Sequence, residues 1–206
     1  MHIILIALIS VVFWASPVAA QGSRALVGIN FGITNPVGDL SDELQRGTSI
    51  AGHVAIRLAG SLAVRGEVGR NQFDPPDEIK AFCDELNIAC PEARITNYNV
   101  GIQYGGFGDQ NRGALGLSKI RVMPYGFATI GRYTASEEGS FEGERFDESN
   151  TFLGFNVGAG LNIRITDHFG LAGDVRAHGV RGDENETDLR KWQYYVVPSV
   201  GVWVLF

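Results

Sequence analysis

The sequence predicts an all-β protein, an eight-stranded, antiparallel, up-and-down transmembrane β-barrel. Three observations carry this prediction. The 206-residue chain holds 27 glycines, all beyond residue 20, and interior glycines destabilise helices by about 1 kcal/mol each. Apolar and polar residues alternate with a period of two in segment after segment, as in strands with one buried face. Long and short connections between these segments mostly alternate along the chain.

The first twenty residues predict a secretory signal peptide, cleaved to leave 21–206 as the barrel domain. Ile3–Trp14 is an almost unbroken apolar run, and Val18–Ala20 are small residues of the kind that precede a cleavage site. The segment lacks the basic residue usual at the start of a signal peptide. An N-terminal membrane anchor is the alternative, but the run is shorter than the ~20 residues of a spanning helix.

Eight segments show the strand pattern. In the first, for example, Val27 and Ile29 lie on one face while Gly28 and Asn30 lie on the other. The predicted strands are Arg24–Thr34, Ser49–Leu58, Ser61–Phe73, Thr96–Tyr104, Ile120–Arg132, Thr151–Ile165, Gly170–Val180 and Trp192–Phe206.

The connections differ in length at the two ends of the predicted barrel. Long polar segments follow the odd-numbered strands: Asn35–Thr48, Asp74–Ile95, Tyr133–Asn150 and Arg181–Lys191. Short turns follow the second and sixth strands: Ala59–Gly60 and Thr166–Phe169. The fourth connection, Gly105–Lys119, is longer than a tight turn. Long loops at one end and short turns at the other are typical of outer-membrane barrels.

The composition of the two faces predicts which one points outward. The polar faces combine glycines with the charged residues Arg57, Arg65, Glu67, Arg164, Asp174 and Arg176. The apolar faces are nearly free of charge, as a lipid-facing band must be, since a basic side chain at the bilayer midplane costs a barrel about 2–4 kcal/mol. A soluble lipocalin-like or sandwich protein is the alternative, because its strands alternate too.

The inward charges predict a plugged lumen. An eight-stranded barrel is just filled by its own side chains, and arginines cannot be buried there without partners. Glu67 and Asp174 are the expected partners of Arg57, Arg65, Arg164 and Arg176. We therefore expect a charge network and no open pore; a gated path for protons or ions is the alternative.

The C-terminal strand carries a specific motif. Ser199, Gly201, Val204 and Phe206 follow a pattern of polar residue, glycine, hydrophobic residue and terminal aromatic residue. This pattern resembles the assembly signal of bacterial outer-membrane barrels, whose last strand docks on the insertion machinery.

The mature chain as a whole resembles the family of eight-stranded outer-membrane barrels that includes the OmpA transmembrane domain, OmpX and the opacity proteins. Pro124–Gly126 and the glycine-rich Gly154–Gly160 add to the resemblance. It implies a location in the bacterial outer membrane, lipids and the insertion machinery as partners, and a monomer. Without a periplasmic domain after the barrel, a cell-wall tethering role is not implied.

Charge is distributed unevenly. The four long segments hold nineteen acidic and seven basic residues, a net charge of −12, whereas the whole chain carries −6. We interpret this acidity mainly as a solubilising property of exposed loops; bridging by divalent cations to lipid phosphates is the alternative. The acidic balance argues against nucleic-acid binding, which needs a basic patch.

Two cysteines lie in the second long segment, Cys83 and Cys90. In an exported protein, neighbouring cysteines are expected to pair, and two are too few for the usual structural zinc site. A short helix should begin near Pro76 and reach about Leu86. A catalytic thiol would need a histidine partner, and no histidine lies in this segment.

No catalytic motif stands out, and we expect neither an enzyme nor a cofactor. A lipid-modifying outer-membrane enzyme would need a serine, a histidine and a carboxylate together on the lipid face. His178 lies near Asp174 in sequence and His53 near Ser49, but both histidines are expected to point inward. The first hypothesis is therefore a non-enzymatic barrel with a structural or surface-interaction role.

Overall fold

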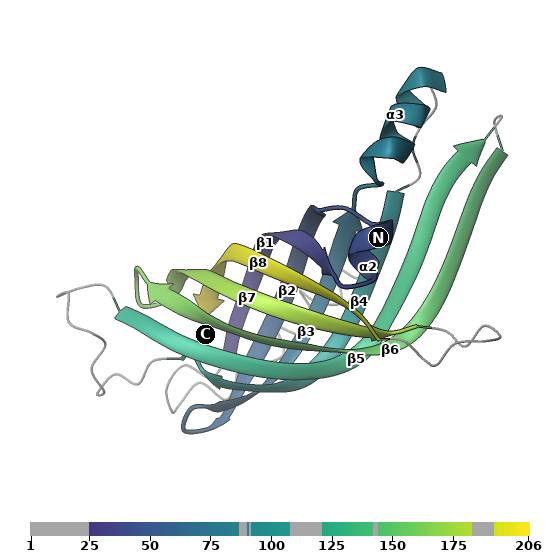
Figure 1. Ribbon diagram of the computed structural model, residues 1–206. Helices are drawn as coiled ribbons and strands as arrows, with labels where there is room; N and C mark the ends of the chain where they lie inside the picture. The colour runs from purple at the N-terminus through teal and green to yellow at the C-terminus, as the bar shows by residue number, and fades with distance from the viewer. Residues whose placement is uncertain (1–24, 87–89, 91, 108–120, 142–143, 183–191) are drawn as a thin grey trace.

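The computed structural model describes residues 25–86, 90, 92–107, 121–141, 144–182 and 192–206. Eight strands form one closed barrel in chain order, each antiparallel to the next, with β8 pairing back onto β1 (Figure 1). This confirms the predicted fold class. Closure leaves every strand of the barrel wall with two neighbours, as a spanning sheet requires.

The strands and helices have the following bounds. The strands are β1 (Ala25–Val37), β2 (Gly47–Ala59), β3 (Leu62–Phe73), β4 (Glu92–Gly105), β5 (Arg121–Phe141), β6 (Glu144–Arg164), β7 (Phe169–Arg181) and β8 (Trp192–Leu205). The helices are α2 (Leu40–Glu43) and α3 (Asp77–Leu86). Neither described helix is long and apolar enough to cross a membrane.

One predicted loop is largely sheet. Segment 133–150 continues β5 and β6 as an antiparallel ribbon, which is paired as far as Phe141 with Glu144. This ribbon extends beyond the barrel (Figure 1). The loop assignment was wrong because it relied on apolar alternation. A ribbon in solvent needs no apolar face, since its backbone hydrogen bonds suffice to define the pairing.

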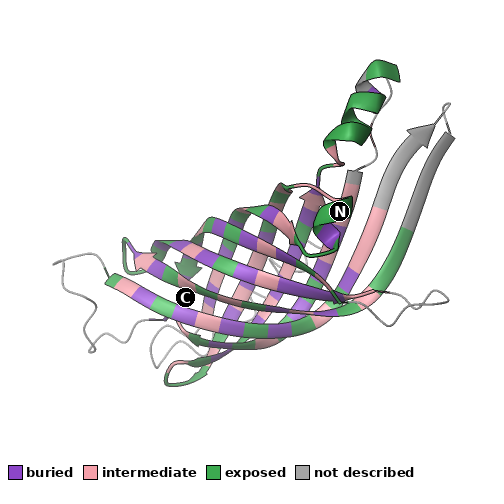
Figure 2. Cartoon of the chain, viewed as in Figure 1, coloured by how far each residue is buried: buried purple, intermediate pink, exposed green. Residues whose placement is uncertain are grey.

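The apolar side chains point outward and the polar ones inward. Val200 is 69% exposed, whereas the side chain of Arg65 is fully buried, and buried and exposed residues alternate along the strands (Figure 2). The soluble lipocalin-like alternative is therefore wrong, because its apolar face would point into the barrel.

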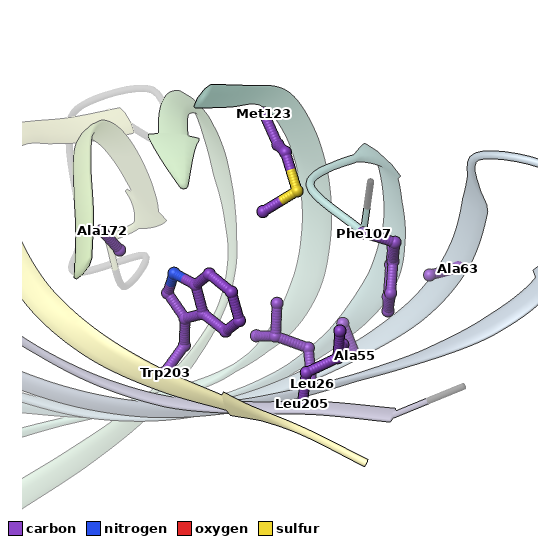
Figure 3. Packing of buried hydrophobic residues seen from close by; sticks show 8 residues of the cluster. All are labelled: Leu26, Ala55, Ala63, Phe107, Met123, Ala172, Trp203 and Leu205. Atoms are coloured by element: carbon purple, nitrogen blue, oxygen red, sulfur yellow. The ribbon is translucent and has the colours of Figure 1, made fainter. Parts of the chain in front are cut away.

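The lumen is filled in three layers. At the end of the barrel where Ala25 pairs with Phe206, apolar side chains pack together (Figure 3): Leu26, Ala55, Ala63, Phe107, Met123, Ala172, Trp203 and Leu205. At the opposite end lies a second cluster: Leu40, Phe73, Ile95, Tyr133, Val180, Tyr195 and Val197. The layer between them is polar and charged, so the charged layer is separated from both ends of the barrel by apolar packing.

Inward glycines make room for large side chains in so narrow a barrel. A β-carbon on Gly158 would lie 2.5 Å from Cζ of Phe127, and one on Gly170 would overlap the indole of Trp203. Only glycine fits where a neighbouring strand's ring lies over the backbone. Part of the high glycine content therefore follows from filling the lumen with rings and guanidinium groups.

Candidate functional site

A chain of four charges crosses the lumen. β3 and β7 lie on opposite walls, four strands apart in the eight-stranded barrel. Glu67 of β3 accepts from Arg65 at 2.8 Å and lies 3.3 Å from Arg176 of β7. Arg176 in turn donates through Nε to Oδ1 of Asp174 at 2.8 Å. All four side chains are buried, so this charged layer ties one wall of the barrel to the other.

Neutral side chains complete the coordination of Asp174. The hydroxyl of Tyr125 donates to its Oδ2 at 2.7 Å, and Nδ2 of Asn30 donates to the same oxygen at 3.0 Å. Ser199 donates to Oδ1. Donors thus reach this carboxylate from β1, β5, β7 and β8, so the site depends on closure of the barrel between β8 and β1.

Glu67 and Arg65 are coordinated in the same way. Asn156 donates through Nδ2 to the second carboxylate oxygen of Glu67 at 2.8 Å. Arg65 donates through Nη1 to Gln103 at 2.9 Å, and its guanidinium carbon lies 4.1 Å from the ring centroid of Phe127. A buried ion pair is tolerated only with such additional hydrogen bonds, and cation–π contact stabilises a desolvated guanidinium further.

Arg57 and Arg164, the other two members of the predicted network, lie nearer to one end of the barrel than these four residues. Arg57 lies over the ring of Phe107, 5.1 Å from its centroid, and Arg164 donates to the carbonyl of Asp167 at 2.6 Å. The register pairs His53 with Glu67, so Arg57 lies four residues nearer to the end at which Ala25 pairs with Phe206. Arg164 is offset by the same four residues from Gly160, the partner of Asp174.

The two inward histidines differ in their surroundings. The ring of His178 stacks on Tyr195, 4.5 Å between centroids, and its Nδ1 lies 3.1 Å from the hydroxyl of Tyr133. Tyr133 also accepts from Asn99 at 3.0 Å. His53 is buried over Gly28. Both histidines point into the lumen, so neither supplies a lipid-facing catalytic group.

Several residues that fill the lumen were missed by the sequence analysis. Tyr125, Phe127, Tyr133 and Tyr195 all reach into the lumen, and Tyr125 contacts Asp174 directly. Three of these aromatic residues follow a period of two from Tyr125 along β5. That period could have placed them inside, but aromatic residues also form girdles on the lipid-facing wall of such barrels.

The outer connections carry the predicted disulfide. Cys83 of α3 is bonded to Cys90, with their α-carbons 5.6 Å apart. The described residues contain no group of three or more acidic, histidine or cysteine side chains arranged to hold a metal ion. The described residues do not include 87–89, 91, 142–143 and 183–191 of the long segments, or the predicted signal peptide at 1–20.

The residues of the C-terminal motif divide between the two faces of β8. Val204 and Phe206 point outward, whereas Ser199 and Gly201 face the lumen. Phe206 donates its amide to the carbonyl of Ala25 at 2.8 Å. The terminal residue thus takes part in the seam that closes the barrel.

Comparisons with known proteins agree with this architecture. The model of the outer membrane protein beta-barrel domain matches residues 4–197. No curated protein sequence matches the chain. Neisserial surface protein A is similar in structure with a TM-score of 0.60 at 17% identity, covering 88% of this chain and 97% of that one.

Two further solved structures share the fold. The attachment invasion locus protein of Yersinia pestis, in complex with the heparin analogue sucrose octasulfate, has a TM-score of 0.50 at 14% identity and covers 90% of this chain and 100% of its own. A major outer membrane protein of Thermus thermophilus has a TM-score of 0.51 at 14% identity, covering 88% of this chain and 99% of that one.

Proposed function

Because this chain belongs to the outer membrane protein beta-barrel domain family and is located in the bacterial outer membrane, we propose that it is a non-conducting barrel that serves as a rigid base for its outer loops. Its role is structural or one of surface interaction. The charged layer inside the lumen carries no flux and instead holds the walls together.

The proposal rests on the chain of charges from Arg65 through Glu67 and Arg176 to Asp174. An ion that entered the lumen would have to displace these buried pairs, and breaking one buried pair costs about 3–5 kcal/mol. The apolar layers at both ends add a second barrier, since a hydrated ion has no polar partners there.

Planar bilayers test this proposal. The protein, inserted into a bilayer beside a porin as the positive control, is expected to give no discrete conductance steps. Large and stable steps from the wild-type protein would contradict a plugged lumen. Insertion is verified independently by resistance of the reconstituted barrel to protease.

The outer end is the proposed contact surface. The disulfide-braced helix α3 and the β5–β6 ribbon extend beyond the barrel (Figure 1). The net charge of −12 in the four long segments disfavours sulfated ligands such as the heparin analogue in the Yersinia pestis structure. Basic partners or divalent cations suit this end better, because opposite charge steers association.

Cation binding is separable from the structural role. Isothermal titration of the full-length protein with Ca²⁺ is expected to give weak, salt-sensitive binding if the acidic segments bridge cations. Absence of binding would leave the loops as solubilising surface and would remove the cation proposal.

We further propose that the C-terminal strand docks on the insertion machinery, that the barrel is monomeric, and that it has no enzymatic activity.

A further inference from the structure

A groove with a volume of about 560 Å³ runs across the outer wall of the barrel. It spans four neighbouring strands, β6, β7, β8 and β1, which lie side by side (Figure 1). Its floor is formed where outward positions hold small residues, Ala159 and Gly173, beside Pro198. Its rim is formed by larger apolar side chains, among them Phe31 and Val200.

The groove lies at mid-height. In β1 it takes in residues 31–33 of a strand that runs from 25 to 37, and in β8 residues 198–200 of a strand that runs from 192 to 205. We therefore expect it to face the middle of the bilayer, away from the lipid headgroups. Asp174 and Ser199 border it only through the wall, since their side chains bond to each other inside the lumen.

The hydrogen-bond ladder is interrupted at the same place. Between β1 and β8, Gly32 pairs with Ser199 and Asn35 pairs with Val196, but the two residues between them on each strand are not paired. Pro198 stands in this gap, and proline has no amide hydrogen to donate to a ladder. The β1–β8 ladder thus has a gap beside the groove, where apolar cover has the most effect because lipid offers no hydrogen-bond partner.

We infer that this groove holds one acyl chain of an outer-membrane lipid more firmly than chains are held elsewhere around the barrel. Burial of each methylene contributes about 0.8 kcal/mol, and a concave wall contacts more of the chain than a convex one. At mid-height the contact is with the chain alone, so binding depends on chain length and is indifferent to the headgroup. The inference rests on the membrane location and is independent of the proposed function.

Native mass spectrometry with defined lipids tests the inference. The purified full-length protein is mixed with dipalmitoyl phosphatidylethanolamine, and the lipid retained at increasing collision energy is measured. Gly173→Leu places a side chain in the groove, and a β-carbon there meets nothing closer than 4.0 Å. This variant is expected to retain about tenfold less lipid, the effect of losing roughly two buried methylenes.

Gly66→Leu is the matched control. Gly66 is on the opposite wall, on β3, and a β-carbon there has open space, so lipid retention should equal that of the wild type. Dipalmitoyl phosphatidylglycerol should bind as well as the ethanolamine lipid, and dioctanoyl phosphatidylethanolamine should not be retained. Ala159→Leu, which fills the groove from β6, replaces Gly173→Leu if that variant does not fold.

Three outcomes overturn the inference. Equal retention by the wild type and the groove-filling variants would show that the groove holds no lipid. Loss in Gly66→Leu as well would show that binding is not local. A wild-type dimer that Gly173→Leu dissociates would assign the groove to a second copy of the chain.

Discussion

Glu67 has more charged and polar partners than a single ion pair requires. It accepts from Arg65 and Asn156 and lies within ion-pair distance of Arg176 across the lumen. Removing this carboxylate takes an acceptor from two buried guanidinium groups, those of Arg65 and Arg176. Buried charges are costly when their partner is removed, even where the intact pair contributes little to net stability.

Glu67→Ala should therefore lower the free energy of unfolding by about 3–5 kcal/mol. Urea titration of the barrel in lipid vesicles measures it. Glu85→Ala, on the exposed surface of α3, is the control and should stay within about 0.5 kcal/mol of the wild type. An unchanged midpoint for Glu67→Ala would show that the arginines find other acceptors.

A second residue-scale prediction concerns a pair of glycines. A β-carbon on Gly170 would overlap the indole of Trp203, whereas one on Gly66 would meet nothing. Gly170→Ala is expected to destabilise the barrel by about 1–3 kcal/mol through overpacking, and Gly66→Ala to be near neutral. Thermal unfolding of both variants tests this prediction, and equal shifts of the unfolding temperature would contradict the packing argument.

At the scale of elements, α3 depends on its disulfide more than on the barrel. Ile79, Phe82 and Leu86 of this helix are exposed, so little tertiary packing supports ten helical residues, a length that is marginal in water. Closing the short ring between Cys83 and Cys90 constrains the unfolded segment by about 2–3 kcal/mol on the chain-entropy model.

The double variant Cys83→Ser, Cys90→Ser should lose amide protection in α3 while protection in β3 stays unchanged. Hydrogen exchange followed by mass spectrometry resolves the two elements. Matching loss of protection in β3 would mean that the outer loop stabilises the barrel itself, contrary to the separation seen in Figure 1.

For the whole molecule, closure of the ladder predicts resistance to detergent. Every strand of the wall pairs on both sides, so no edge is open to attack. The unboiled protein from the outer-membrane fraction should migrate faster in gels containing sodium dodecyl sulfate than the boiled protein. Identical migration would argue against a stable closed barrel.

Alternation along single strands was enough to predict the fold and its polarity. A period of two assigns Arg65, Glu67, Asp174 and Arg176 to the inside whatever the register, because neighbouring residues must point to opposite faces. The pattern also separates the lipid-facing residues of β8 from those in the lumen, which is why the orientation of the barrel could be predicted correctly.

Relative height could not be predicted in the same way. Which arginine contacts which carboxylate depends on the stagger between strands that are far apart in sequence. Alternation with a period of two carries no information on that stagger. The sequence therefore assigns Arg57 and Arg164 to the inner face but does not predict their level relative to Glu67 and Asp174. The β5–β6 ribbon was missed for a different reason, since its strands need no apolar side.

The layered lumen has a consequence for how the protein responds to ionic strength. In the closed lumen that we propose, apolar layers around Trp203, Phe107 and Phe73 exclude mobile counterions from the charged layer, and buried pairs are screened far less than exposed ones. Raising the salt concentration should thus leave the interior pairs nearly untouched while it weakens the repulsion among the acidic outer segments. On this proposal, the same chain carries one set of charges that salt screens and a second set that it does not.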